Sequence, residues 1–372
     1  MNVAVRDLPK PAQTGASRLA VADCDMHLGP AGLGELAPWL SARWRDHMAT
    51  YGVAHRTGMQ QGLPSYPKAQ PNAARRDAWP DSGRPPGTDL EFTRRQHLDP
   101  NNIVFGLVNP PTPSNNFMNF ELGNALCRAM NEFQVEKLVT PEPRLHASIV
   151  VNPESPEAAV AEIERCAGNP AFAHVLLLSR TAAPIGNARY FPIFAAAVRA
   201  GLPVGMHAFG FGGNANTSSG WASFYLEDMI GHAQTCQAQL TSLVIEGVFE
   251  RLPDLRFVMI EGGFGWVPAL AWRLDKHWQR LRSETPHLKR LPSETIRSQV
   301  WFTTQPMEEP EPRAHLLDTI GWIGWDRLLF ATDYPHWDSD DPAYALPLPV
   351  EEAQRRALFS DNALALYAPR GG

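Results

Sequence analysis

The chain has 372 residues, of which 44% are hydrophobic and 19% are charged, and its formal net charge is −6. This composition is typical of a globular protein with a large core, and the negative charge argues against nucleic acid or an anionic membrane as a partner. The four cysteines lie far apart and no apolar stretch is long enough to span a membrane. We therefore predict a cytoplasmic protein without a disulfide framework.

Eight short runs of apolar and β-branched residues, bounded by turn residues, predict buried strands. Segments of helical periodicity follow most of them, and this alternation is typical of a parallel sheet. Eight units predict a (β/α)8 barrel. An open doubly wound sheet is the alternative, but no G-x-G-x-x-G follows any of the runs. The expected strands are Leu19–His27, Asn102–Asn109, Leu145–Asn152, Ala173–Ser179, Leu202–Ala208, Arg256–Gly263, Val300–Gln305 and Leu328–Tyr334.

Several of the intervening helices have clear boundaries. Ser155 followed by Pro156, for example, is an N-cap residue followed by proline at the first helical position, where a missing N–H is tolerated. The expected helices are Phe120–Leu138, Pro156–Ala167, Tyr190–Ala200, Trp221–Phe249, Trp266–Arg282, Pro312–Ile320 and Pro349–Leu358.

Two stretches interrupt this alternation. Residues 28–98 separate the first two strands and are rich in proline, glycine, arginine and aromatic residues. Loops of this length usually have a function or are disordered, and we expect this one to be an ordered cover over the barrel mouth. Residues 209–220 are expected to act as a lid hinge. Residues 1–17 are expected to be a flexible tail, and residues 18–372 to form a single barrel domain.

Metal-binding residue types stand at the carboxyl ends of three expected strands. Asp25 and His27 end the first strand and point to the same side, because they are two residues apart. His207 ends the fifth strand and Asp333 the eighth. Each alone could be a hydrogen-bonded core or turn residue. Because all barrel strands end on one face, the four together predict a site for one divalent ion, with Zn²⁺ preferred and Mn²⁺ or Fe²⁺ as alternatives.

The chain resembles the amidohydrolase-2 group, the branch of metal-dependent hydrolases that includes aminocarboxymuconate-semialdehyde decarboxylase and γ-resorcylate decarboxylase. The resemblance covers nearly the whole chain. It implies a (β/α)8 barrel with one catalytic divalent ion bound by Asp25, His27, His207 and Asp333. Relatives in this group tend to be dimers, so it also implies a homodimer. The motifs that carry the resemblance are Asp25-x-His27 and residues 190–207, 253–263, 302–306 and 332–336.

Two positions depart from the pattern of that group. Asp25 stands where the first ligand is commonly His or Glu, and it is one methylene shorter than Glu. Glu261 stands where the named decarboxylases have a histidine used for proton transfer. The second departure puts a direct transfer of the decarboxylase mechanism in doubt.

Three residues are candidates for moving protons. Asp333 could be both metal ligand and base. Glu261 could be a general acid, because an apolar surrounding would raise its pKa, or it could be a buried carboxylate bonded to the backbone of the glycines after it. His336 could assist proton transfer or pack within its loop.

Three further residues are candidates for contacting a substrate. Arg180 ends the fourth strand and could bind a carboxylate through two parallel N–H groups, although a surface ion pair is an equal alternative. Gln305 ends the seventh strand and could donate to a developing oxyanion. Trp221 could form part of an aromatic pocket, although tryptophans in a barrel are more often packing residues.

The first hypothesis is a mononuclear metal-dependent hydrolase that cleaves a C–N or C–C bond of a small carbonyl or aromatic acid through metal-activated water. The alternative is a non-oxidative decarboxylase, in which the ion holds the carboxylate of the substrate. The third is a barrel that binds a ligand without catalysis. The substrate in either enzyme would be a small molecule.

Overall fold

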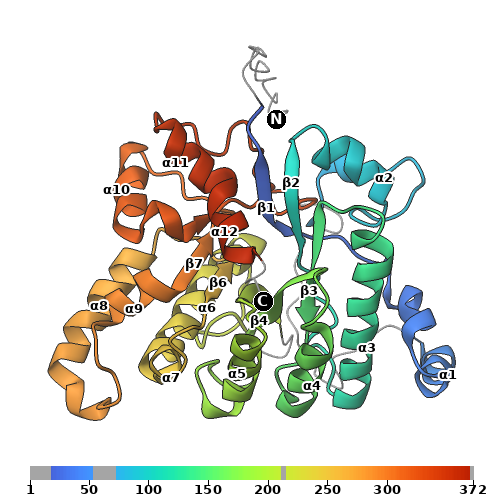
Figure 1. The fold of residues 1–372 in the computed structure, drawn as a ribbon, viewed down its shortest axis with the longest axis horizontal. Helices are drawn as coiled ribbons and strands as arrows, with labels where there is room; N and C mark the ends of the chain where they lie inside the picture. The colour runs from blue at the N-terminus through green and yellow to red at the C-terminus, as the bar shows by residue number, and fades with distance from the viewer. Residues whose placement is uncertain (1–17, 53–72, 211–214, 369–372) are drawn as a thin grey trace.

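The computed structural model describes residues 18–52, 73–210 and 215–368. At its centre is one sheet of eight strands in sequence order, and all neighbouring strands are parallel. Tyr334, beyond β8, forms a parallel bridge with Met26 of β1, which brings the last strand back to the first. The predicted (β/α)8 barrel is confirmed (Figure 1). The strands are β1 (Val21–Met26), β2 (Ile103–Val108), β3 (Leu145–Val150), β4 (Phe172–Arg180), β5 (Val204–Gly210), β6 (Phe257–Ile260), β7 (Val300–Thr303) and β8 (Leu328–Leu329).

Helices lie around the outside of the strands (Figure 1). They are α1 (Ala42–Tyr51), α2 (Leu90–Thr93), α3 (Phe120–Phe133), α4 (Pro156–Cys166), α5 (Phe191–Arg199), α6 (Tyr225–Ile245), α7 (Val248–Arg251), α8 (Val267–Leu281), α9 (Pro292–Gln299), α10 (Ala314–Ile323), α11 (Glu352–Arg356) and α12 (Asn362–Tyr367). The sequence did not predict α1, α2, α9 or α12. The helix expected at Trp221–Phe249 is divided, because Gly247 has a left-handed backbone (φ 71°) between α6 and α7.

The eighth strand is shorter than expected. Its ladder ends at Leu329, although apolar residues continue beyond it. The N–H of Ala331 donates to the hydroxyl of Thr304, and the N–H of Thr332 donates to the carboxylate of Asp23. In a regular sheet, these two N–H groups would donate to the backbone of a neighbouring strand. Here they donate to side chains, in the segment that leads to Asp333.

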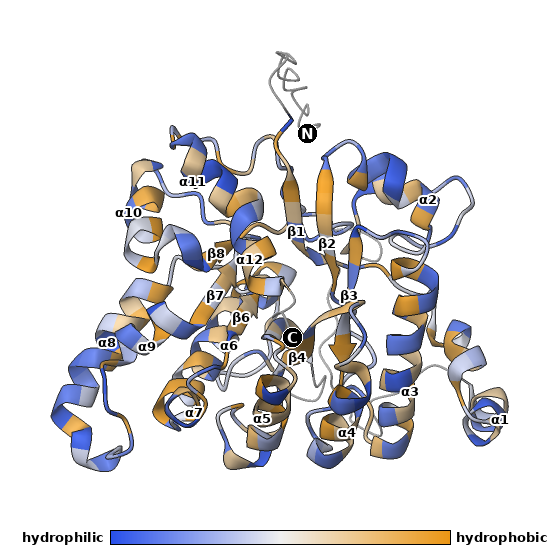
Figure 2. Ribbon diagram, in the orientation of Figure 1, coloured by the Kyte–Doolittle hydropathy of each residue, from blue (hydrophilic) through white to orange (hydrophobic). Residues whose placement is uncertain are grey.

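The core lies between the strands and the helices. All residues of β1 and β6 are buried, as in strands that are covered on both faces. Figure 2 shows the strands mostly in the colours of apolar residues, with hydrophilic residues on the outer turns of the helices. The strand ends are thus fixed by a rigid core, which positions the polar residues that follow them.

The described part of the 28–98 insertion contacts both the barrel wall and the segment after β8. The ring of Trp39 meets Phe133 of α3 at 5.6 Å between centroids. Ala74 pairs with His336 in an antiparallel bridge, and the N–H of Arg75 donates to the carbonyl of Pro335 over 2.9 Å. The predicted tail at 1–17, residues 53–72 of the predicted cover and residues 211–214 of the predicted hinge lie outside the described residues. The cover and the single domain remain predictions.

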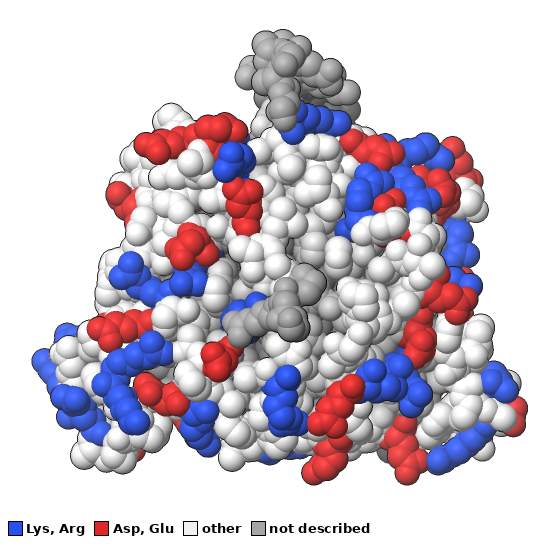
Figure 3. All heavy atoms as spheres, in the orientation of Figure 1, with Lys and Arg blue, Asp and Glu red and all other residues white. Residues whose placement is uncertain are grey.

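Within the described ranges, no helix combines the length and the apolar character needed to cross a membrane. Basic and acidic side chains are interspersed over the face of the molecule shown in Figure 3.

Candidate metal centre and active-site pocket

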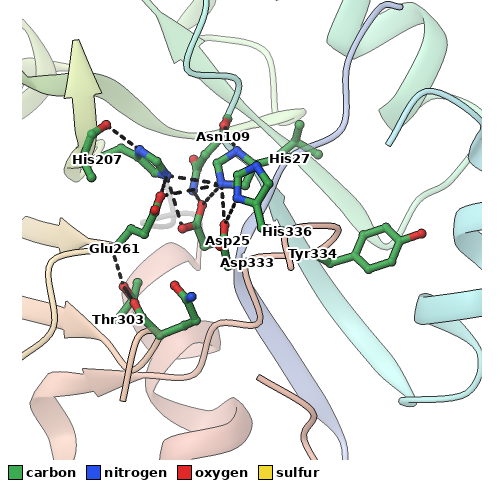
Figure 4. A network of polar contacts seen from close by, with 12 residues as sticks. Asp25, His27, Asn109, His207, Glu261, Thr303, Asp333, Tyr334 and His336 are labelled. Atoms are coloured by element: carbon green, nitrogen blue, oxygen red, sulfur yellow. Dashed lines mark hydrogen bonds and ion pairs between the residues drawn. The ribbon is translucent and has the colours of Figure 1, made fainter. Parts of the chain in front are cut away.

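The carboxyl ends of β1, β5, β6 and β8 bring six titratable side chains together (Figure 4). Ligand atoms of Asp25, His27, His207 and Glu261 lie within 4.8 Å of one another. Asp333 and His336 form a second such group with His27. Four of the six side chains were predicted from the sequence as ligands of one ion. The six are Asp25, His27, His207, Glu261, Asp333 and His336.

The hydrogen bonds of the two histidines fix how their rings face the centre. Nδ1 of His27 lies 2.9 Å from the carbonyl oxygen of Asn109, and Nδ1 of His207 lies 2.7 Å from that of Ala208. A carbonyl only accepts, so each Nδ1 is the N–H donor and each neutral ring presents an Nε2 lone pair. The two Nε2 atoms are 3.3 Å apart. Two lone pairs that face each other at this distance repel unless a cation lies between them.

Carboxylate oxygens surround the same point. Nε2 of His27 is 2.8 Å from Oδ1 of Asp333, and Nε2 of His207 is 3.4 Å from Oδ2 of Asp25 and 2.7 Å from Oε2 of Glu261. The buried atoms Oδ2 of Asp25 and Oε2 of Glu261 have no partner in hydrogen-bond geometry. Two ligands of one ion, each about 2.1 Å from it, are themselves about 3.0–3.4 Å apart. The spacing and the unbonded oxygens fit a bound divalent cation.

Two of these carboxylates stand on strained backbone. Glu261 has φ 54° and Asp333 has φ 62°, in the left-handed region that side chains other than glycine rarely adopt. The N–H of Glu261 donates to the hydroxyl of Thr303 over 3.1 Å, and the N–H of Asp333 donates to the carbonyl of Asp25 over 3.0 Å. Such conformations persist only where the surroundings hold them, and they are concentrated at functional sites.

Burial and neighbouring charges shift the pKa values in this cluster in opposite directions. Burial raises the pKa of Asp25, but His207 and His27 outweigh it and lower the value to about 2. Burial lowers the pKa of His207, but the carboxylates of Asp25 and Glu261 raise it well above its usual value. A proton and a metal ion would therefore compete for Nε2 of His207.

Glu261 differs from our expectation. Burial raises its pKa, but the charge of His207 and the contact with it lower the pKa more, so the net shift is downward. The predicted raised pKa was wrong, because the imidazole partner comes from a segment more than fifty residues away. At neutral pH, Glu261 is a carboxylate and can act as a base or a ligand.

Asp333 links the two groups of ligand atoms. Its Oδ1 accepts a hydrogen bond from Nδ1 of His336 over 2.7 Å. The His336 ring stacks on His27 at 4.3 Å between centroids. Burial disfavours the charged imidazole, but Asp333 raises the pKa of His336 to about 9. Asp333 therefore favours the doubly protonated form of His336, in which one ring N–H is bonded to the carboxylate.

A pocket of about 600 Å³ opens beside this cluster. Glu261 and His336 line it, and so does the predicted substrate contact Arg180 at the end of β4. Three aromatic side chains, Phe209, Tyr225 and Trp337, complete much of the wall. The pocket thus places a guanidinium and flat apolar surfaces next to the titratable groups.

Two predicted substrate contacts do not line this pocket. Trp221 is 44% exposed and lines a different pocket of about 460 Å³ beside the start of α6. Gln305 is fully buried, and its amide lies 3.5 Å from the carbonyl oxygen of Asp338. The described aromatic wall is formed by other residues, because α6 begins after Trp221 and turns Tyr225 towards Trp337.

Asn109 is a residue of the site that our sequence analysis did not single out. It follows β2 and is fully buried. Its side-chain amide donates to Oδ1 of Asp25 over 2.9 Å, and its backbone carbonyl accepts from His27. The signal that identified the other residues, a polar group at the end of a buried strand, was present here too.

The parallel barrel and the cluster at its carboxyl ends are those of a metal-dependent barrel enzyme. Residues 22–368 match the model of the amidohydrolase family. The chain belongs to this family, as its motifs indicated.

Known relatives include two γ-resorcylate decarboxylases. The one from Polaromonas sp. is 26% identical over 255 residues, which cover 66% of this chain and 76% of the relative. The one from Rhodococcus jostii is 23% identical over 299 residues, which cover 75% of this chain and 88% of the relative. Among solved structures, a 5-carboxyvanillate decarboxylase from Novosphingobium aromaticivorans, complexed with manganese and 4-hydroxy-3-methoxy-5-nitrobenzoic acid, has a TM-score of 0.70 at 18% identity. That alignment covers 96% of this chain and 99% of the other, and it supports the fold.

Proposed function

We propose that this chain is a metal-dependent, non-oxidative decarboxylase of a hydroxylated aromatic acid. The observation that carries the proposal is a pocket that joins Arg180 and three aromatic rings to the ligand cluster, in a chain whose relatives are named γ-resorcylate decarboxylases. The alternative of our sequence analysis is thereby preferred to the hydrolase. We retain the prediction of a small-molecule substrate, and the homodimer and the cytoplasmic location remain predictions.

In this reaction, the bond between the ring carbon and the carboxylate carbon breaks and CO₂ leaves. The electron pair stays on the ring carbon, which takes up one proton, so no water is consumed. A bound divalent cation would supply positive charge that stabilises electron density on the oxygens of the substrate. Asp25, His27, His207 and Asp333 would hold it, and Glu261 is close enough to be a further ligand.

The remaining steps belong to side chains of the pocket. Arg180 would orient the carboxylate of the substrate, because a guanidinium matches it with two parallel N–H groups. Tyr225 and Trp337 would hold the ring flat. His336 would donate its second ring proton to the ring carbon, while its Nδ1 stays hydrogen-bonded to Asp333. Solvent would then return the proton to His336.

The metal in this proposal is Mn²⁺. Three carboxylates and two imidazoles form an oxygen-rich set, which suits Mn²⁺ as well as Zn²⁺, and the Novosphingobium relative was crystallised with manganese. Reconstitution of metal-depleted protein with each ion in turn would distinguish Mn²⁺ from the Zn²⁺ that we first expected.

A specific observation favours hydrolysis as the second candidate. Glu261 is a carboxylate at neutral pH, at the position where the family resemblance implies a proton-transferring histidine, and it could act as base for an attacking water.

The test is product analysis with Mn²⁺-loaded protein and a panel of hydroxybenzoates that includes 2,6-dihydroxybenzoate. In D₂O, a decarboxylase releases CO₂ and leaves one deuterium on the ring. In H₂¹⁸O, a hydrolase places ¹⁸O in its product and a decarboxylase places none in the phenol. Incorporation of ¹⁸O without CO₂ would reject the decarboxylase, and His207→Ala serves as the inactive control.

A further inference from the structure

We propose that a second, apolar pocket beside the metal centre binds an apolar substituent of the substrate. The preferred acid would then carry an alkyl group on its ring. This inference rests on the proposed function for the identity of the acid. The pocket has a volume of about 240 Å³ and lies between the segments that follow β1 and β2.

The position of this pocket connects it to the site. His27, a candidate metal ligand, lines it. Pro111 and Thr112 line both this pocket and the larger pocket that contains Arg180 and His336. The two pockets therefore meet at Pro111 and Thr112. A ring bound in the larger pocket would have to carry its substituent over these two residues to reach the smaller one.

The chemistry of the lining excludes a charged occupant. The described lining residues include Leu28, Leu33 and Met130 and four prolines, and none of them is Lys, Arg, Asp or Glu. His27 is the single titratable residue among them, and both its nitrogens are engaged, with Asn109 and with the cluster. An alkyl group would leave water for this largely apolar surface.

The pocket is preformed and can be filled by substitution. Its prolines restrict the backbone, so little conformational freedom is lost when a ligand binds. A Cβ placed on Gly29 or Gly32 would meet no atom within 4 Å, and neither glycine has a left-handed backbone. Gly32 has φ 178°, an extended conformation that any residue can adopt. A leucine at Gly32, which lines the pocket, would therefore meet neither a clash at its Cβ nor backbone strain.

The experiment compares 2,6-dihydroxybenzoate with its 3-alkyl and 4-alkyl homologues, from methyl to pentyl. We expect Kd and KM of the Mn²⁺-loaded protein to fall by about fourfold per methylene in one series, until the pocket is full. In Gly32→Leu, the preference for the propyl compound over the parent acid should fall at least about tenfold. Gly321→Leu is the matched control, because Gly321 lies in α10 and its Cβ would also meet no atom. It should keep the native preference.

The outcomes separate this inference from the proposed function. Equal binding of parent and alkylated acids by the native protein, or an unchanged preference in Gly32→Leu, would overturn the subsite. Chain-length-dependent binding that Gly32→Leu removes, without CO₂ release from any acid, would support the subsite and reject the decarboxylase. Thermal melting checks that Gly32→Leu folds, and Gly29→Val offers a second way to fill the pocket.

Discussion

Asn109 holds Asp25 by a hydrogen bond of 2.9 Å from its side-chain amide to Oδ1 of the carboxylate. The same residue accepts a hydrogen bond from Nδ1 of His27 through its backbone carbonyl. Its own side-chain oxygen accepts from the hydroxyl of Ser148 over 2.6 Å. One buried residue after β2 therefore orients both candidate ligands of β1 and leaves Oδ2 of Asp25 directed to the centre.

We predict that Asn109→Leu weakens metal binding by about 10–100-fold, the usual effect of removing a group that orients a ligand. The amide no longer fixes Asp25, although the ligands themselves are all present. Competition with a chelator measures the affinity. Asn131→Leu is the control, because Asn131 is equally buried but bonds Val150 and Glu162. An unchanged affinity in Asn109→Leu would show that Asn109 is a structural residue only.

His207→Ala should lose most of the bound metal. Nε2 of His207 lies within 3.4 Å of His27, Asp25 and Glu261, so its removal takes away the ligand that all three face. Elemental analysis of the purified variant gives the metal content per chain. His146→Ala is the control, because this half-buried histidine of β3 stacks on Phe105. Full metal content in His207→Ala would reject the assignment of the centre.

If Glu261 acts as the base of the hydrolase alternative, Glu261→Gln should retain the metal and lose turnover by about 10²–10⁴-fold, the range for a group that transfers a proton. In the proposed decarboxylase, in which His336 delivers the proton, turnover should stay close to the native value. Glutamine keeps the shape and an oxygen near His207, but it lacks the negative charge with which Glu261 would accept a proton. Metal analysis and kcat are measured on the same preparation. Loss of metal from the variant would show that Glu261 is a ligand. A native kcat would show that Glu261 has no role in the reaction. Glu162→Gln, in α4, is the control.

The strand ends could be predicted from the sequence because the pattern that marks them is local. Asp25, His207 and Asp333 each follow a short apolar run, and parallel strands that close into a barrel end on one face. The order of the elements followed from the same alternation. The eighth strand was predicted too long. The apolar run continues to Ala331, but the N–H groups of Ala331 and Thr332 bond the side chains of Thr304 and Asp23.

Properties that depend on contacts between distant segments could not be predicted. The pKa of Glu261 shifts down because His207 lies 2.7 Å away, a contact that no local pattern contains. The aromatic wall depends on where α6 begins, and that boundary places Tyr225 beside Trp337 while leaving Trp221 outside. The helices of the 28–98 insertion were obscured by its many proline and glycine residues.

Acid should weaken the attachment of this insertion to the barrel. Glu142 accepts hydrogen bonds from Nε of Arg144 and from Nε of Arg94, each 2.8 Å long, and Arg94 belongs to the insertion. The bond from Arg144 is the largest cause of a lowered pKa, about 2, for this carboxyl group, of which only 5% is exposed. Because the folded pKa lies below the unfolded value of about 4.3, the stabilisation is complete above pH 5 and is lost as the pH falls towards 2.

Glu142→Gln should therefore lower the free energy of unfolding by roughly 1–3 kcal/mol at pH 7. The difference from the native protein should shrink as the pH falls from about 5 towards 2, because the native carboxyl group becomes protonated and neutral as well. Urea unfolding at pH 7 and at pH 3 measures both values. Glu164→Gln is the control, because the Glu164–Arg199 pair is exposed and such pairs contribute little. If the native and Glu142→Gln curves stay parallel from pH 7 to pH 3, the arginines do not hold this carboxylate in its charged form.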